Sequence, residues 1–401
     1  MPITESVKSF RVRALEFLEA NASRRDESEG EERGVALFAE STAEEDQANL
    51  TVARAWANTV FDAGFGWISG PPEYGGAGLS RAHETAFRSL ESQFDTPTRS
   101  VYGIGLGMVA PTILAHGTEL VKQRYLKEMY RGDIVACQLF SEPGAGSDLA
   151  SLSTRAIRDG DEWVVSGQKV WTSNAHLASI GEIICRTDPD LPKHKGLTGF
   201  VVDMTAPGVE VRPLRQATGG ASFNEVFFDA VRIPDDHRLG DVNGGWGVAL
   251  TTLMNERAAI GGGSGGGLGI DTEHLIELAR RFGKISDPLV RQQLTKIIIG
   301  RRVAAFTNQR AMAKVAAGAV PGPEMSLAKM ALTANLMAVT DFVTSVLGPR
   351  LTADSGEQGT YEWSTFAMGV PGMRIAGGSD EVLRNIVSER VLGMPKDPPP
   401  R

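Results

Sequence analysis

The sequence predicts an α+β protein in which a helical region, a region of short strands and a second helical region follow one another. Apolar residues recur at helical spacing before residue 134 and again after residue 240. Between these regions, short runs rich in β-branched and aromatic residues are separated by Gly, Pro and Asp, with no helical pattern between the runs. We therefore expect three domains: residues 1–133, 134–240 and 241–401.

The first domain is expected to be helical because four stretches share the same apolar rhythm. These stretches are residues 7–20, 44–63, 79–93 and 108–130. The charged run 24–33 predicts a solvated loop between the first two helices. The Gly- and Pro-rich segment 70–78 predicts a turn.

The middle domain is expected to be a small antiparallel β structure, because turn residues and not helices separate its strands. The predicted strands are residues 135–140, 162–170, 197–204, 209–214 and 224–233.

Helices are expected again in the third domain, where the apolar spacing returns to a helical period. The predicted helices are residues 245–259, 272–282, 288–316, 325–347 and 380–392. The glycine run 260–270 follows a helix and not a strand. It is therefore a poor match to a dinucleotide-binding fingerprint and predicts an interruption.

Composition disfavours several classes of partner. Hydrophobic residues make up 42% and charged residues 22% of the 401 residues, which suits a packed globular chain. A net charge of −8 disfavours nucleic acid or an anionic membrane as the main partner. No apolar run approaches the ~18 residues of a membrane-spanning helix, so no membrane span is expected.

Cysteine and histidine usage bears on location and metal binding. Cys137 and Cys185 are too few for a disulfide framework, and the N-terminal sequence lacks a secretory apolar run. We therefore expect a cytoplasmic protein. The six histidines show no metal-ligand spacing, so no metal site is expected.

Two motifs lie in the predicted β domain. The loop Ser141–Asp148 (SEPGAGSD) follows a predicted strand, and its glycines would let backbone N–H groups approach an anionic or carbonyl oxygen. Trp171–Asn174 (WTSN) places a flat ring beside two hydroxyls, a set that suits a planar heteroaromatic ligand. Each motif also has a purely structural interpretation, as a capped tight turn and as a buried Trp beside turn hydroxyls.

Two further motifs lie in the second helical region. Glu256-Arg257 closes an apolar helical segment, where a carboxylate can act as a base; an exposed charge pair is the alternative. Near the C-terminus, Ser379 predicts a helix N-cap directly after Gly377 and Gly378. The N–H groups of these glycines could hold a phosphate, a carbonyl oxygen or a flavin edge, although a simple capped helix would have the same sequence.

In this order, the motifs resemble the acyl-CoA dehydrogenase family of flavoenzymes, and the resemblance extends over nearly the whole chain. It is carried by residues 73–80 (EYGGAGLS), 116–156, 167–176 (GQKVWTSNAH), 223–250 and 377–395. The resemblance implies an N-terminal helical domain, a middle β-barrel-like domain and a C-terminal four-helix bundle. It also implies non-covalent FAD, an acyl-CoA substrate, an electron-transfer flavoprotein as electron acceptor, and a homotetramer or dimer.

The resemblance further implies roles for individual residues. The residues at flavin-binding positions are Leu139, Phe140, Ser141, Ser147, Trp171, Thr172, Ser173, Ser379 and Glu381. Three residues match positions that contact the substrate: Ser147 at the pantetheine, Arg257 at the CoA moiety, and Gly377 at the thioester oxygen.

The implied reaction is the α,β-dehydrogenation of an acyl-CoA thioester to the trans-2-enoyl-CoA. A carboxylate removes the α-proton, and a hydride leaves the β-carbon for flavin N5. Many family members carry this carboxylate in a Tyr-Glu-Gly-Thr segment, but the matching residues here, Ala376–Ser379, include no carboxylate. A smaller branch uses a Glu-Arg pair, so we predict Glu256 as the base, with Asp380 and Glu381 as the remaining candidates.

Two segments depart from the family pattern at positions that reach a neighbouring subunit's FAD. Residues 279–283 (ARRFG) replace an Arg-x-x-Phe-Gly motif, and residues 347–363 replace a Gln-x-x-Gly-Gly motif. Arg291 is the candidate replacement for the first arginine. These departures leave open a non-catalytic or complementing subunit of a heteromeric acyl-CoA dehydrogenase. An oxidase of the same fold, acting on an acyl-CoA or a nitroalkane, is a further alternative.

Overall fold

The computed structural model describes residues 5–25, 37–38, 41–261, 270, 272–316, 322–323, 325–354, 356–357 and 360–396. These residues fall into two compact units. Unit 1 contains residues 5–25, 41–214 and 222–252, and unit 2 contains residues 37–38, 215–221 and the described residues after 252. The predicted loop 24–33 and the predicted glycine interruption lie mostly outside the described residues.

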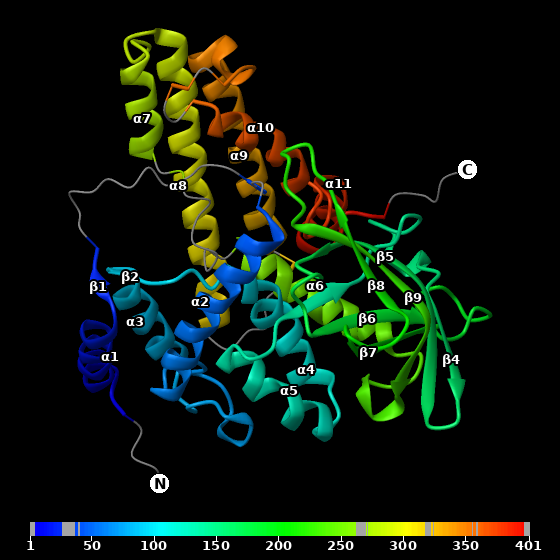
Figure 1. Cartoon of the computed structure of the whole chain (residues 1–401). Helices are drawn as coiled ribbons and strands as arrows, with labels where there is room; N and C mark the ends of the chain where they lie inside the picture. The colour runs from blue at the N-terminus through cyan, green and yellow to red at the C-terminus, as the bar shows by residue number, and fades with distance from the viewer. Residues whose placement is uncertain are drawn as a thin grey trace, which may run out of the picture. The chain divides into compact units, whose positions relative to one another are not determined.

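The helices of unit 1, labelled in Figure 1, cover the four stretches predicted to be helical. They are α1 (Val7–Asn21), α2 (Ala43–Asp62), α3 (Arg81–Glu91), α4 (Ala110–His116) and α5 (Glu119–Arg131), with a π-helical turn at η3 (Gly105–Val109). Helix α2 begins with a capping box between Thr42 and Glu45. Phe10, Leu18 and Phe87 pack in one apolar core of this region.

The single helix predicted at 108–130 is two helices. A side chain at Gly117 would meet the carbonyl oxygen of Ile113 at 2.6 Å, and Thr118 has extended backbone and caps α5 through the Val121 N–H. The chain therefore ends one helix and starts the next at this Gly-Thr pair, a boundary that the apolar spacing alone does not mark.

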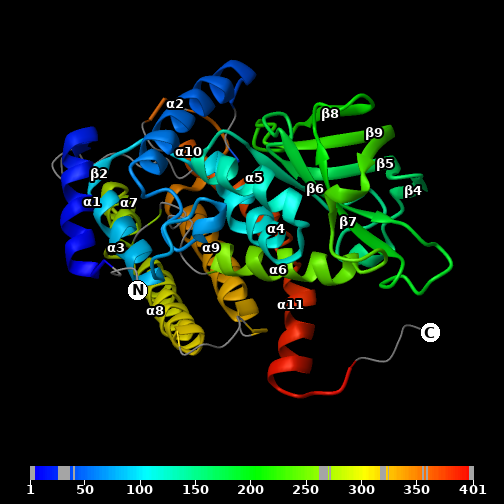
Figure 2. The same cartoon turned by 90° about the horizontal axis from the view of Figure 1, so that it is seen from below.

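The strands of unit 1 form an eight-stranded sheet in the order β10-β7-β6-β4-β5-β9-β8, with β3 paired to β6. They are β3 (Ala136–Leu139), β4 (Arg155–Asp159), β5 (Glu162–Ser173), β6 (Ile180–Arg186), β7 (Leu197–Asp203), β8 (Val209–Leu214), β9 (Phe223–Pro234) and β10 (Arg238–Leu239). Figure 2 shows β8, β9 and β5 side by side. A separate short pair joins β1 (Ser23–Arg24) to β2 (Phe94–Asp95).

The pairing in this sheet is mixed. Most neighbours are antiparallel, as predicted, but β3 and β4 both run parallel to β6. Strands β4 and β6 were not expected from the sequence, because β4 is mostly charged and Glu182 interrupts the apolar run of β6. Cys137 and Cys185 are fully buried in the core of this sheet, where burial raises the pKa of each thiol to about 12.

Unit 2 is a helical bundle. Helix α6 (Gly245–Gly261) enters it, followed by α7 (Thr272–Arg281), α8 (Pro288–Ala316), α9 (Met325–Leu347), α10 (Glu362–Met373), α11 (Asp380–Ile386) and the π-helical turn η7 (Val387–Val391). Helices α8 and α9 lie side by side (Figure 1) and have the predicted bounds. Phe342, Trp363 and Phe366 lie in the bundle core.

Helix α9 is apolar for most of its length. By length and hydropathy alone, the stretch Ser326–Leu351 could cross a membrane. However, Leu336, Val339 and Phe342 on this helix pack in the bundle core, and Lys329 near its start is fully buried among polar partners. These contacts are those of a core helix in a folded bundle.

Candidate functional site

The loop Ser141–Asp148 leaves the carboxyl end of β3. Leu139 and Phe140 are buried, so their side chains belong to the packing of the unit, whereas Ser147 is exposed. The carbonyl oxygen of Ser141 accepts a hydrogen bond from the N–H of Val170 at 2.9 Å. This bond joins the loop to β5 and brings the first two sequence motifs together.

A buried ion pair supports the same loop. Lys169 Nζ lies 2.9 Å from Glu142 Oε1 and donates to the carbonyl oxygen of Phe140 at 3.0 Å. Glu142 also accepts from the backbone N–H groups of Ser153 and Thr154, at 2.6 and 2.9 Å. Burial alone would raise the pKa of Glu142, but the charge of Lys169 and these donors outweigh it and lower the pKa to about 2. Glu142 is therefore an anion in the folded chain.

The Trp171–Ser173 segment has an unusual backbone. The pairing of β5 with β9 shifts register between Lys169 and Thr172, and Trp171 has a φ of 60° at this point. A positive φ is strained for a bulky residue and is concentrated at functional sites. The Trp171 side chain is 61% exposed, which leaves its ring available to a ligand.

The residues of the Trp171–Ser173 segment and of the Ser141–Asp148 loop fit a bound flavin. Thr172 is 1% exposed, yet its Oγ1 has no hydrogen-bond partner within the described chain. A buried hydroxyl without a partner is uncommon and is satisfied when a polar ligand reaches it. Around Gly144 and Gly146, the positions that a Cβ would take are open, so a ligand can approach the backbone of this loop.

In unit 2, the turn 374–380 precedes α11. Gly377 and Gly378 have φ values of 70° and 95°, and Ser379 caps α11 by accepting from the Val382 N–H at 3.4 Å. Among the residues that the structure describes, no acceptor faces the N–H of Gly377 or of Gly378. These donors are therefore available to an oxygen of a ligand.

A buried network of hydrogen bonds fixes the backbone of this turn. Lys329 Nζ donates to the carbonyl oxygens of Arg374 and Gly378, each at 2.9 Å, and lies 3.4 Å from Asp380 Oδ1. Asp380 also accepts from Thr333 Oγ1 at 3.0 Å and from Arg374 Nε at 2.8 Å. With this many donors around it, Asp380 serves as the acceptor of a structural network and is poorly placed to take a proton from a substrate.

Glu256 and Arg257 lie on the part of α6 that belongs to unit 2, and both are half-buried. Burial lowers the pKa of Arg257, Glu256 opposes this effect, and Arg390 adds to it. The Arg257 Nε has no hydrogen-bond partner in the described part of the chain. Burial likewise lowers the pKa of Lys329, and Asp380 and Glu256 oppose this effect. Glu256 is thus within electrostatic range of the turn's buried ammonium group.

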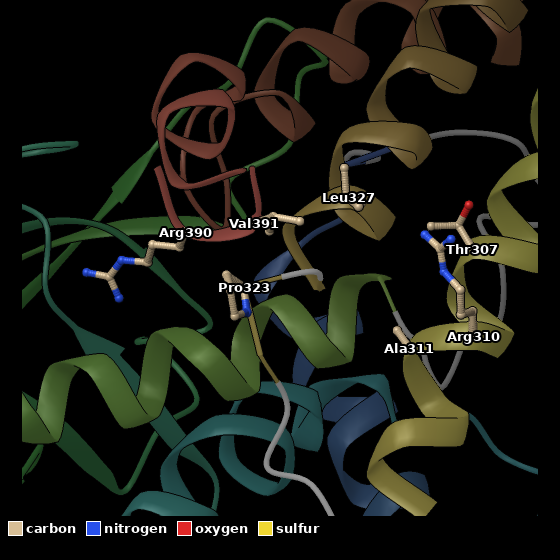
Figure 3. Close-up of a pocket in the computed structure, with 7 residues that line it drawn as sticks. All are labelled: Thr307, Arg310, Ala311, Pro323, Leu327, Arg390 and Val391. Atoms are coloured by element: carbon tan, nitrogen blue, oxygen red, sulfur yellow. The ribbon is translucent and has the colours of Figure 1, made fainter. Parts of the chain in front are cut away.

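A pocket of about 360 Å³ lies between α8, the start of α9 and η7 (Figure 3). The residues that line it are Thr307, Arg310, Ala311, Pro323, Leu327, Arg390 and Val391. Arg310 and Arg390 are the charged residues among them, and Figure 3 shows the Arg390 side chain directed away from Arg310. The charge of Arg390 also lowers the pKa of Arg257. The chemistry of this pocket suits an anionic group.

Two predicted residues lie apart from these features. Arg291 is exposed in the first turn of α8, and the helical rise separates it from Arg310 by about 28 Å along the helix. Glu381 is exposed on α11. The predicted roles of both residues toward FAD stay predictions.

Sequence reasoning missed the buried lysines. The sequence contains a pattern that includes Lys329, because Ser326, Lys329, Thr333 and Leu336 are spaced so that they share one face of a helix. In the structure, all four are buried on α9. Lys169 had no such signal. It lies beside the β-bulge of β5, where the alternation of inward and outward residues is broken.

Three family models together match most of the chain. They are described as the N-terminal, middle and C-terminal domains of acyl-CoA dehydrogenase, and they match residues 32–133, 137–231 and 243–392.

Individual proteins with similar sequences and structures agree with these matches. The acyl-CoA dehydrogenase IpdE1 of Mycobacterium tuberculosis is 38% identical over 351 residues, which cover 86% of this chain and 88% of that protein. A solved structure described as "Tcur3481-Tcur3483 steroid ACAD" has a TM-score of 0.78 and 27% identity, over 99% of this chain and 100% of the other. The ChsE4-ChsE5 complex from M. tuberculosis has a TM-score of 0.73 and 25% identity, over 99% and 100%.

Proposed function

The chain belongs to the acyl-CoA dehydrogenase family of FAD-dependent oxidoreductases, and on this premise we propose that it converts an acyl-CoA thioester to the trans-2-enoyl-CoA with Glu256 as the base. One observation carries the assignment of the base. Glu256 is half-buried in the same unit as the Gly377-Gly378 turn and lies within electrostatic range of Lys329, which holds that turn. The other acidic candidates are occupied or exposed, because Asp380 is held in the network and Glu381 faces solvent.

Different residues of the chain have different roles in this reaction. Glu256 takes the α-proton of the thioester. The N–H of Gly377 donates to the thioester oxygen, an interaction that strengthens as negative charge develops there. A bound FAD would supply the acceptor for the hydride that leaves the β-carbon. Trp171, Thr172 and the Ser141–Asp148 loop hold FAD through the exposed ring, the unpartnered hydroxyl and the open backbone described above.

The positive pocket supports the assignment of a CoA thioester as the substrate. Arg310 and Arg390 line this pocket, the charge of Arg390 also acts on Arg257, and the phosphates of CoA are the matching anions. For the acyl group, the similar structure described as a steroid ACAD makes a fused alicyclic acyl-CoA the first substrate class to test.

We further propose that the chain works as an oligomer in the cytoplasm and passes its electrons to an electron-transfer flavoprotein. The support for an oligomer is an exposed apolar stripe on α8. Ile299, Val303 and Phe306 follow one face of this helix and are 56%, 57% and 67% exposed. This α8 stripe is available to a second subunit, either another copy or a related chain.

A complementing subunit of a heteromer is the second candidate function. Two of the similar solved structures are named as pairs of different chains, and two segments of this chain depart from the motifs that reach a neighbouring subunit's FAD. If this candidate is correct, the chain expressed alone will bind FAD poorly, and co-expression with a related chain will restore the yellow colour.

The test is anaerobic reduction of the chain expressed alone. We expect a yellow protein whose flavin absorbance is bleached by one class within a panel of straight, branched, aromatic and alicyclic acyl-CoAs. Glu256→Gln should lower the bleaching rate by about 10²–10⁴-fold while FAD stays bound. Glu277→Gln, an exposed change on α7, is the matched control.

Three outcomes would change the proposal. Bleaching that survives in Glu256→Gln would refute the base. A yellow protein that no acyl-CoA reduces would refute the reaction. A reduced flavin that reoxidises rapidly in air would favour an oxidase over transfer to a flavoprotein.

A further inference from the structure

We propose that Lys329 is a positioning residue that sets the orientation of the Gly377–Ser379 backbone, and through it the donors that this turn offers to FAD and the thioester. The inference rests on the proposed function. It goes beyond that function in assigning a role to a buried ammonium group whose partners in the described chain are two backbone carbonyls and the Asp380 carboxylate.

The position of Lys329 fixes peptide planes of the turn. Lys329 Nζ holds the carbonyl oxygens of Arg374 and Gly378, at the two ends of the turn, at 2.9 Å each. The C=O and N–H of a trans peptide point in opposite directions. Fixing the Gly378 carbonyl on Lys329 therefore aims the following N–H, that of Ser379, away from the bundle interior. Because the Arg374 and Gly378 carbonyls are both held, the backbone between them, including the Gly377 N–H, has fewer orientations open to it.

The backbone of the turn cannot fix its own conformation. Gly377 and Gly378 both have positive φ, a region that glycine enters freely, and glycine is also the residue with the largest choice of other conformations. Without an anchor, the two residues would sample several orientations of their N–H groups. The ammonium group supplies the anchor from α9, a rigid core helix.

The charge of Lys329 strengthens its hold on the turn. Lys329 is fully buried, and Asp380 compensates its charge while also accepting from Thr333 and Arg374. A charged donor makes shorter and stronger hydrogen bonds to carbonyl oxygens than a neutral donor does. The network thus combines a strong hold on two carbonyls with a satisfied set of buried polar groups.

The test compares variants of the FAD-loaded chain. Lys329→Met combined with Asp380→Asn removes both charges together, which avoids an unpaired buried charge. We expect kcat to fall at least about tenfold with a KM change below about threefold, because misaligned donors cost most in the transition state. FAD affinity should fall, and backbone amides of 375–380 should exchange hydrogen faster than in the wild type.

Leu336→Ala is the matched control, since it weakens the same helix inside the bundle core. It should lose comparable thermal stability with kcat, FAD affinity and exchange at 375–380 unchanged. If this control shows the same losses as the double variant, Lys329 has only a structural role and the proposal is wrong. A folded double variant with kcat and FAD affinity within twofold of wild type would also overturn it.

Two further experiments apply if the double variant does not fold or if no acyl-CoA reduces the wild type. If the double variant does not fold, Thr333→Val removes a single donor to Asp380 and should lower kcat about threefold; an unchanged kcat overturns the proposal. If the wild type is reduced by no acyl-CoA, the proposed function fails, and FAD affinity with amide exchange then decides the role of Lys329 without any activity measurement.

Discussion

The ammonium group of Lys169 lies 2.9 Å from the carboxylate of Glu142, and both side chains are buried. This pair lies directly behind the Ser141–Asp148 loop, because Lys169 also holds the Phe140 carbonyl and Glu142 begins the loop's hairpin with Ala145. The Ser141–Asp148 loop of unit 1 and the Gly-Gly turn of unit 2 are thus both fixed by a buried lysine that donates to backbone carbonyls.

We expect Lys169→Met to destabilise the protein by about 3–5 kcal/mol, because it leaves Glu142 as a buried anion without its cation. Thermal unfolding measures this loss. Lys193→Met is the matched control, since Lys193 pairs with Asp148 at the exposed surface and should contribute no more than about 1 kcal/mol. Equal losses in the two variants would show that the buried pair has no special role.

Thr172→Val tests whether the unpartnered hydroxyl belongs to the flavin site. The substitution keeps the shape of the side chain and removes an Oγ1 that has no partner in the described chain, so stability should be unchanged or slightly higher. FAD affinity should fall about five- to tenfold, measured by flavin fluorescence titration. Thr85→Val on α3 should leave FAD affinity unaltered, and a Thr172→Val protein with wild-type affinity would remove Thr172 from the site.

Glu182→Gln tests a buried carboxyl group in unit 1. Glu182 is fully buried on β6, accepts a hydrogen bond from Thr252 at 2.6 Å, and has a pKa that burial raises to about 8. The folded chain holds this proton more tightly than the unfolded chain. The contribution of Glu182 to the free energy of unfolding is therefore fully present below about pH 4.5 and is lost as pH rises toward 8.

Glutamine does not titrate, so the variant should gain more than about 1 kcal/mol over wild type at pH 8.5 and much less at pH 5. Thermal unfolding across this pH range is the measurement. Glu128→Gln, an exposed change on α5, should show no such trend. A difference between Glu182→Gln and wild type that does not vary with pH would contradict the prediction.

Phe306→Glu tests the α8 stripe as a subunit contact. A charge in the middle of a buried apolar interface is strongly unfavourable, so sedimentation should show a smaller assembly than in the wild type. Leu289→Glu is the control, because Leu289 is 76% exposed on the same helix but lies outside the stripe. An assembly unaffected by Phe306→Glu would place the interface elsewhere.

Periodicity predicted the long elements best. The bounds of α8 and α9 follow from uninterrupted apolar spacing over 29 and 23 residues. Helix α10 was not predicted, because Gly369 and Pro371 disfavour a helix locally and the packing of Trp363, Phe366 and Val370 in the core outweighs them.

The site was predicted as segments and not as a network. Glycine and serine motifs indicate where backbone can approach a ligand, and they predicted the Ser141 loop and the Gly377 turn. The Trp171 segment was predicted from its aromatic residue and adjacent hydroxyls. The groups that hold those segments come from distant parts of the chain. The spacing from Lys329 to Asp380 is set by how α9 and α11 pack, which no local pattern encodes.

The burial of both cysteines has a practical consequence for labelling. With thiol pKa values near 12 and no solvent contact, Cys137 and Cys185 present almost no thiolate to a maleimide at neutral pH. A single cysteine introduced at Leu289, which is exposed and lies outside the α8 stripe, would therefore take up a fluorescent or spin label without background. Subunit exchange between labelled chains could then be followed in real time, with this chain alone or mixed with a related one.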